Sequence, residues 1–150
     1  WGRPDMAPMI FANSILNSKP INIYNYGDMI RDFTYIDDVV EIVYRCTKKV
    51  PISEDSFNIQ ELLTDRSFAP FRIFNVGNST PIKLMDFIDV LEKELGFKAI
   101  KNYMDMQMGD VKCTFSDTNE IKDWVNFSPN TPFALGIKRF AEWYKSYYKV

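Results

Sequence analysis

The sequence predicts a mixed α/β domain in which short strands alternate with amphipathic helices. Apolar residues recur at every second position in Ile21-Asn22-Ile23-Tyr24, a spacing typical of a strand with one buried face. Further along, apolar residues recur at the spacing of one helical face, at Leu84, Phe87, Ile88, Leu91 and Leu95. A chain of 150 residues can bury one core of ordinary size, so we treat residues 1–150 as one domain.

Composition and charge exclude several classes of function. No apolar run approaches the ~20 residues of a membrane span, and a net charge of −2 leaves no basic excess for sequence-independent binding of nucleic acid. The chain contains no histidine, and Cys46 and Cys113 are far apart, which excludes His-based catalysis and most zinc sites built from this chain alone. We expect a cytoplasmic protein with two free thiols and no membrane or nucleic-acid partner.

The first third of the chain predicts a helix, a strand and a second helix. Asp5 is placed to cap a helix that runs through Ile15 and Leu16 and ends before Lys19-Pro20. After the strand, Asp37 and Asp38 are placed to cap a helix over residues 39–48, where they would put negative charge at its positive end. The apolar face expected for this helix comprises Val39, Val40, Ile42, Val43 and Cys46.

The middle of the chain predicts a long surface loop, a strand and a helix. Residues 51–70 lack a clear period and are rich in Ser, Asp and Glu. Residues 71–76 carry a strong strand signal and are followed by a turn at 77–81. Gly96 directly follows the helix of the leucine pattern and is expected to end it in a left-handed conformation.

The last third predicts a short strand over residues 97–103, an irregular segment over 104–114, and two helices. Asp117 and Glu120 resemble a capping box for the first helix. Pro132 is expected at the first position of the second helix. The buried face of that helix is predicted to be Phe133, Ile137, Phe140, Ala141, Tyr144 and Tyr148, with Lys138, Lys145 and Lys149 on its solvated face.

The stretch from Gly27 to Asp38 contains the most suggestive single residue. Arg31 lies between the strand signal and the next helix, where a fixed guanidinium is suited to bidentate binding of a phosphate. The alternative is an ordinary ion pair with a neighbouring carboxylate, from Asp32, Asp37 or Asp38. The stretch itself does not decide between the two.

Six short motifs follow one another along the chain: GRPDMA, RDFTYIDD, APFRIFNVGN, QMGD, SDTNEIKDW and RFAEWYKSYYK. In this order they closely resemble the C-terminal part of the extended short-chain dehydrogenase/reductase family, and within it the UDP-glucuronate 4-epimerases. The resemblance covers nearly the whole chain, excepting residues 51–66. It implies a C-terminal nucleotide-sugar-binding part of that fold, without most of the Rossmann sheet. Because the chain starts with Trp and its motifs begin at once, we expect a piece of a longer protein.

The resemblance implies a binding role for particular residues. Arg31 matches the arginine that clamps the sugar-nucleotide diphosphate, and Asp110 matches an acidic residue that commonly holds the ribose hydroxyls. Phe33 matches an aromatic residue near the nucleotide. Asn22 and Tyr24 match strand positions against which the uracil packs.

Two further matches concern the sugar. Arg3 matches an arginine that reaches the sugar carboxylate in glucuronate epimerases. Gln107 stands where many family members have arginine, which resembles the glucuronate branch and weakens an assignment as a UDP-galactose epimerase or a dTDP-glucose dehydratase. Without that arginine, Arg31 would carry more of the charge compensation at the diphosphate.

The family's catalytic machinery is not expected in this chain. The family binds NAD through closely spaced glycines, whereas the six glycines here never cluster. Its catalytic Ser/Thr and Tyr-x-x-x-Lys precede the motif that GRPDMA resembles. Tyr44 and Lys48 have that spacing, but we interpret them as an ordinary pair on a helix surface.

The resemblance therefore implies the UDP-sugar-binding part of an NAD-dependent enzyme that inverts C4 of UDP-glucuronate, with the product UDP-galacturonate. Hydride would pass from C4 to NAD and return to the opposite face of the keto-sugar. NAD binding and a homodimer interface would both belong to the absent half, and the isolated piece would be inactive and able to self-associate. Two alternatives remain: another nucleotide-sugar epimerase, dehydratase or decarboxylase, and a non-catalytic binding or scaffold domain.

Overall fold

The computed structural model describes residues 3–53 and 64–150, and these residues fall into two compact units. The first unit contains residues 3–31, 81–114 and 131–150, and the second contains residues 32–53, 64–80 and 115–130. None of the helices in the described ranges combines the length and apolar character that crossing a bilayer requires.

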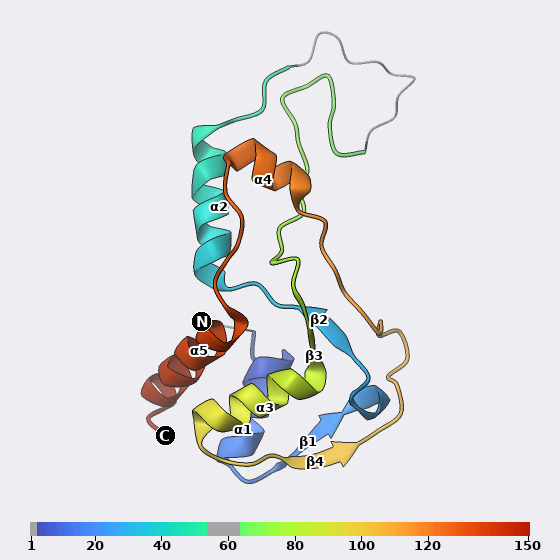
Figure 1. Ribbon diagram of the computed structural model, residues 1–150, viewed down its shortest axis with the longest axis vertical. Coiled ribbons are helices and arrows are strands. Elements are labelled where there is room, and N and C mark those ends of the chain that lie inside the picture. Colours follow the sequence, from blue (N-terminus) through green and yellow to red (C-terminus); the bar gives the residue numbers. More distant parts are fainter. Residues whose placement is uncertain (1–2, 54–63) are drawn as a thin grey trace. The chain divides into compact units, whose positions relative to one another are not determined.

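The first unit packs three helices with a pair of parallel strands. The helices are α1 (Ala7–Leu16), α3 (Leu84–Leu95) and α5 (Phe133–Tyr148), and the strands are β1 (Pro20–Ile23) and β4 (Ile100–Tyr103). Figure 1 shows β1 and β4 side by side, in a register that places Asn22 opposite Asn102. A second pair of strands is formed by β2 (Ile30–Asp32) and β3 (Pro81–Lys83), and β3 leads directly into α3.

The core of this unit is the apolar face of α3. The side chains of Phe87, Ile88 and Leu91 are fully buried, and the Phe87 ring stacks on Phe11 of α1 with a centroid distance of 5.9 Å. Burial of such side chains is worth roughly 1.5–3 kcal/mol each, so this face dominates the stability of the unit. Gly96 follows α3 with φ of 86°, which confirms its predicted role at the end of the helix.

The second unit contains α2 (Ile36–Lys48), α4 (Asn119–Val125) and the extended segments that join them. Its small core is formed by Ile42, Ile121 and Val125, with partly buried aromatic rings around them. Trp124 is held firmly, since its indole N–H donates to the carbonyl of Lys49 at 3.1 Å while the Lys49 ammonium lies 4.5 Å from the ring centroid.

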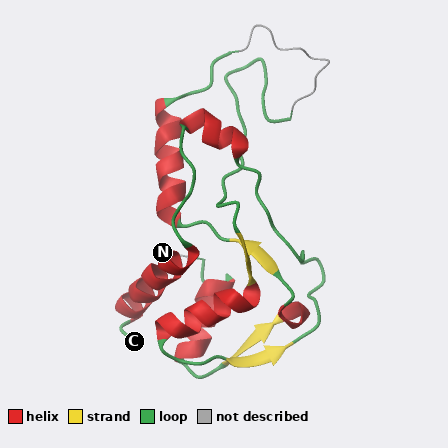
Figure 2. Cartoon of the chain, viewed as in Figure 1, coloured by secondary structure: helices red, strands yellow, loops and turns green. Residues whose placement is uncertain are grey.

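The strand predicted for residues 71–76 is not formed in the described part of the chain, where residues 64–80 are drawn as loop (Figure 2). Only an isolated antiparallel bridge joins Arg66 to Arg72. Burial does alternate over part of the segment, because Phe71 and Ile73 are exposed while Arg72 and Phe74 are partly buried. The sequence pattern of a strand is present, but no described strand offers it a ladder of hydrogen bonds. The predicted loop over 51–70 lies partly outside the described residues.

Three helix starts differ from the predictions. The first helix begins at Ala7 after Met6, with Pro8 in its first turn, and Asp5 pairs with Arg3 instead of capping it. The helix expected from residue 39 begins at Ile36, so Asp37 and Asp38 lie inside its first turn, where negative charge still favours the helix dipole. Pro132 precedes the last helix rather than opening it.

The capping box predicted for α4 is not formed, because the N-cap residue is Thr118 and makes no side-chain cap hydrogen bond. The Asp117 carboxylate accepts a hydrogen bond from the backbone N–H of Asn119 at 3.1 Å. Glu120 does not reach back to the helix start, because its carboxylate pairs with Arg66 at 3.0 Å. An available guanidinium thus replaces the backbone N–H as the partner of Glu120.

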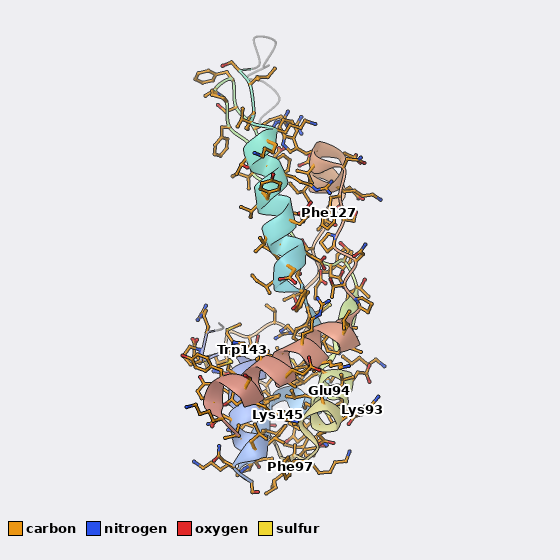
Figure 3. All side chains as sticks on the ribbon, turned by 90° about the vertical axis from the view of Figure 1, so that its left-hand side faces the viewer. Lys93, Glu94, Phe97, Phe127, Trp143 and Lys145 are labelled. Atoms are coloured by element: carbon orange, nitrogen blue, oxygen red, sulfur yellow. The ribbon has the colours of Figure 1, made fainter. Side chains whose placement is uncertain are left out.

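The buried and solvated faces predicted for α2 and α5 also differ from the structure. Val40 and Val43 of α2 are each 57% exposed, and Tyr148 of α5 is 46% exposed, although all three were expected to be buried. Lys145 was expected on the solvated face, but its ammonium donates to the carbonyl of Glu94 at 2.9 Å (Figure 3). That carbonyl belongs to the last turn of α3, where a cation also offsets the negative end of the helix dipole. Cys46 is partly buried and Cys113 is exposed, both as free thiols.

Candidate functional site

Arg31 lies in the middle of β2, and its guanidinium is fixed from three directions. One terminal nitrogen, Nη1, donates to the backbone carbonyls of Ile30 at 2.8 Å and Lys112 at 3.2 Å. The other, Nη2, donates to the Asp110 carboxylate at 2.8 Å. The Arg31 side chain is 26% exposed, so it is held in place and still reaches solvent. The ionic partner of Arg31 within the first unit is Asp110, 79 residues away in sequence.

The Arg31 guanidinium keeps unused capacity. It has five N–H donors, and three are engaged by described residues. The remaining two are the Nε–H and one N–H of Nη2, and neither donates to a described residue. Free N–H donors of a guanidinium suit the oxygens of a phosphate. The ion pair and the phosphate clamp are therefore compatible in this geometry.

Asp110 is presented by a tight turn. Its backbone N–H donates to the Gln107 carbonyl at 3.2 Å, and Gly109 has φ of 82°, a conformation that favours glycine at the third position of such a turn. One carboxylate oxygen, Oδ1, accepts hydrogen bonds from Arg31 and from the backbone N–H of Val111. The other oxygen makes no hydrogen bond with the described residues and can accept one from a ligand hydroxyl. The side chain of Gln107 is exposed on the same turn.

Asn22 and Tyr24 lie at the end of β1, beside β4. The side-chain carbonyl of Asn22 accepts a hydrogen bond at 2.9 Å from Asn102, its partner in the register. Asn22 is exposed and Tyr24 is partly buried at the start of the short 3-10 segment Tyr24–Gly27. The structure thus gathers Asn22, Tyr24, Arg31, Gln107 and Asp110 in the first unit.

Arg3 belongs to the first unit and Phe33 to the second. Arg3 lies at the exposed start of the first unit and binds the Asp5 carboxylate through two nitrogens, at 2.6 and 3.2 Å. The hydrogen bond from Arg3 lowers the pKa of Asp5. An exposed pair of this kind contributes little stability, so another carboxylate can replace Asp5 at low cost. Phe33 is partly buried in the second unit.

The glycines of the described ranges do not follow one another closely between a strand and a helix, which is the spacing of a dinucleotide-binding turn. Tyr44 and Lys48 lie against each other on α2, with the Lys48 ammonium 5.1 Å from the centroid of the Tyr44 ring. Within the described ranges, no group of three His, Cys, Asp or Glu could hold a metal ion.

Two hollows are each lined by residues of a single unit. One, of about 500 Å³, is in the first unit between α1 and the end of α5, and Tyr144 and Tyr148 are part of its lining. The other, of about 400 Å³, is in the second unit and is lined largely by small polar side chains, including Ser79, Ser116 and Thr118. Neither is lined by any of the predicted ligand-binding residues.

Sequence reasoning missed two side chains next to the site. Tyr26 and Asp105 are joined by a hydrogen bond of 2.9 Å between the phenol and the carboxylate, and this hydrogen bond raises the pKa of Tyr26. A local signal was available, because Asn25 and Gly27 flank Tyr26 and both residue types favour left-handed backbone. The pairing with Asp105 itself, 79 residues away, leaves no such signal.

The matching family model and two similar relatives agree on the kind of protein that this chain resembles. Residues 2–59 match the model of the NAD dependent epimerase/dehydratase family. The chain is 44% identical to a probable UDP-glucuronate 4-epimerase of Rhizobium meliloti, over 99% of this chain and 44% of that protein. It is 41% identical to UDP-glucuronate 4-epimerase 1 of Arabidopsis thaliana, over 99% of this chain and 34% of that protein. The chain thus spans less than half the length of these relatives.

A solved structure supports the same assignment. The UDP-glucuronic acid 4-epimerase from Bacillus cereus, in complex with UDP-glucuronic acid and NAD, superposes on 97% of this chain with a TM-score of 0.77 and 27% identity. The match covers 41% of that protein. The described residues accordingly form a small mixed α/β structure that aligns with part of an epimerase of the extended short-chain dehydrogenase/reductase type. The chain thus matches a part, about 40%, of proteins related to the NAD-dependent epimerase/dehydratase family.

Proposed function

We propose that this chain is the UDP-sugar-binding part of an NAD-dependent UDP-glucuronate 4-epimerase, and that residues outside it bind NAD and carry out the proton and hydride transfers. The observation that carries the proposal is the state of Arg31. Its guanidinium is fixed by two carbonyls and a carboxylate, yet two of its five N–H donors make no hydrogen bond with the described residues. A prefixed arginine loses little conformational freedom when a diphosphate binds, which favours affinity.

Residues near Arg31 would bind the other parts of the UDP-sugar, namely the ribose and the uracil. The second oxygen of Asp110 would accept hydrogen bonds from the ribose hydroxyls, while the end of β1 at Asn22 and Tyr24 would pack against the uracil. Gln107 offers an uncharged amide on the same turn as Asp110, so Arg31 would be the principal cation of the diphosphate site. Phe33 would contact the nucleotide. These contacts fix the position of the sugar, which is how binding energy far from the reacting atoms serves a reaction.

Arg3 would recognise the feature that distinguishes glucuronate from glucose. Its guanidinium already holds a carboxylate through two nitrogens, and the C6 carboxylate of the sugar would replace Asp5. Arg3→Ala is therefore expected to weaken binding of UDP-glucuronate and leave binding of UDP-glucose unchanged. Equal loss for both ligands would contradict this role and would favour another nucleotide-sugar enzyme of the family.

The decisive experiment compares Arg31 with a structural arginine of similar surroundings. Arg45 of α2 pairs with Glu41 at 2.7 Å and donates to the carbonyls of Val125 and Asn126, all within the second unit. Affinity for UDP would be measured by calorimetric titration and stability by thermal unfolding, on the wild type and on the Arg31→Ala, Arg31→Lys and Arg45→Ala variants. These measurements would use the full-length protein that contains this chain.

The two roles give opposite results. Loss of a charge-assisted contact to phosphate is worth on the order of 2–4 kcal/mol, so Arg31→Ala should weaken UDP binding roughly 30- to 1000-fold. Arg31→Lys should recover only part of this, because an ammonium lacks the planar fork. Arg45→Ala should lower the melting temperature and leave UDP affinity unchanged. An Arg31→Ala protein that melts early but binds UDP normally would refute the proposal.

A further inference from the structure

Two segments of the first unit run beside each other and are joined at both ends. At one end, the backbone N–H of Tyr26 donates to the carbonyl of Met104 at 3.1 Å. At the other end, the N–H of Ile30 donates to the carbonyl of Lys112 at 2.9 Å, and the N–H of Thr114 donates to the carbonyl of Ile30 at 3.2 Å. The turn over residues 107–110, which presents Gln107 and Asp110, lies between these two attachments.

The turn has little packing of its own. Met108 at its tip is 99% exposed, and Met106 just before it is 41% exposed. Apolar burial therefore cannot hold the turn in one position. Its position depends on the attachments at its two ends, together with the pair between Asp110 and Arg31.

The attachment at Tyr26 has an unusual backbone. Asn25 and Tyr26 both have left-handed conformations, with φ of 48° and 52°, and Gly27 continues them with φ of 87°. Left-handed backbone is costly for residues other than glycine and persists where its surroundings impose it. Part of the compensation is local, because the Asn25 side chain donates to the carbonyl of Asp28 at 2.8 Å. The turn also directs Tyr26 toward the 104–110 segment.

Burial of the ring does not explain this conformation of Tyr26, because the residue is 63% exposed. What the side chain gains is the hydrogen bond from its phenol to the Asp105 carboxylate, at 2.9 Å. Asp105 lies two residues before Gln107, at the start of the exposed turn. The phenol therefore adds a side-chain attachment at the point where the backbone attachment at Met104 ends.

We propose that Tyr26 is a positioning residue for the ligand site: through Asp105 it holds the start of the 107–110 turn and so keeps the Asp110 carboxylate against Arg31. Its effect on ligand binding depends on the function proposed above, whereas its effect on the turn does not. Tyr26 need not touch the ligand in this role. It limits the motion of the segment that carries two of the ligand-binding side chains.

The test combines amide hydrogen exchange with UDP titration on single variants. Tyr26→Phe removes the phenol and keeps the ring, while Tyr103→Phe is the matched control, since the Tyr103 hydroxyl makes no hydrogen bond with the described residues and Tyr103 is 47% exposed. Asp105→Ala removes the acceptor and Asp105→Asn retains a side-chain carbonyl that can accept the phenol proton.

Tyr26→Phe and Asp105→Ala should each speed exchange of the Asp110 and Val111 amides several-fold and weaken UDP binding about 3- to 10-fold, the range expected for one hydrogen bond. The double variant should be no worse than either single variant, and Asp105→Asn and Tyr103→Phe should resemble the wild type. Unchanged exchange in Tyr26→Phe would overturn the proposal. So would faster exchange with unaltered UDP affinity. If the wild type itself fails to bind UDP while Tyr26→Phe still speeds exchange, the proposed function fails and the positioning of the turn stands.

Discussion

Glu92 offers the sharpest quantitative prediction, because it is a buried carboxylate with three defined partners. Its side chain is 1% exposed and accepts hydrogen bonds from Lys101 and Lys98 at 2.6 Å each and from the backbone N–H of Ala99 at 3.0 Å. Burial alone would raise the pKa of Glu92, but these three hydrogen bonds outweigh it and lower the pKa from 4.5 to about 2. The group joins the end of α3 to the start of β4.

The sign and size of the effect follow from the direction of this shift. A carboxyl group whose pKa is depressed in the folded state stabilises the protein above its unfolded pKa and loses that contribution as the pH falls. The shift from 4.5 to about 2 corresponds to on the order of 3 kcal/mol, at 1.36 kcal/mol per pKa unit. That contribution should be complete near neutral pH and disappear between about pH 5 and pH 2.

The assay is urea unfolding followed by tryptophan fluorescence, at several pH values between about 7 and 2. Glu92→Gln should destabilise the protein by a few kcal/mol near neutral pH, because it leaves two ammonium groups without their carboxylate. The gap between wild type and variant should close as the pH falls. Glu142→Gln, at a position where the carboxylate is 64% exposed, is the control and should change stability little.

The two lysines provide an internal check. The Lys101 side chain is 23% exposed and that of Lys98 is 85% exposed, so solvent screens the second interaction far more than the first. Lys101→Met should therefore cost more stability than Lys98→Met. A gap between wild type and Glu92→Gln that stays constant down to about pH 2 would refute the reasoning, since it would mean that the ionised carboxylate contributes nothing.

The remaining predictions use the same material. Gly27→Ala should lower the melting temperature clearly, because Gly27 has φ of +87° and an added Cβ would lie 2.8 Å from the sulfur of Met85; Gly96→Ala, where nothing lies within 4 Å, should cost only the left-handed backbone term of about 1–2 kcal/mol. Calorimetric titration of this chain with NAD should give no binding, because its glycines do not cluster, and micromolar affinity would contradict the assignment. Light scattering at high concentration should detect self-association of the chain through its exposed apolar residues, whereas a clean monomer would count against it.

The sequence predicted a helix or strand correctly where residues close together in the chain determine it. The helix Leu84–Leu95 matched its apolar pattern and its terminal glycine because both are set by neighbours in sequence. The start of the first helix was missed although Pro8, a residue favoured in the first turn, gave the better signal than Asp5. The sequence could not show where α2 begins. Asp37 and Asp38 interact favourably with the helix dipole both as caps before the helix and as residues of its first turn.

Long-range pairing explains the other differences. Residues 71–76 have the composition of a strand, but a strand also needs a neighbour, and none is described beside them. Glu120 was assigned to a cap because the pattern of four residues cannot reveal that Arg66 is nearby. The partners of Tyr26 and Arg31 are each 79 residues away, beyond any periodicity argument.

The same long-range pairing changes the question that the sequence posed about Arg31. From the sequence, an ion pair and a phosphate clamp were alternatives, since a guanidinium beside several aspartates seemed to serve one or the other. The structure pairs Arg31 with Asp110 and with two carbonyls, and this uses three of its five N–H donors. The ion pair then fixes the orientation of the two donors that remain. In this geometry the ion pair with Asp110 prepares Arg31 for contact with phosphate. Substitution of Asp110 should therefore weaken phosphate binding although Asp110 itself does not contact the phosphate.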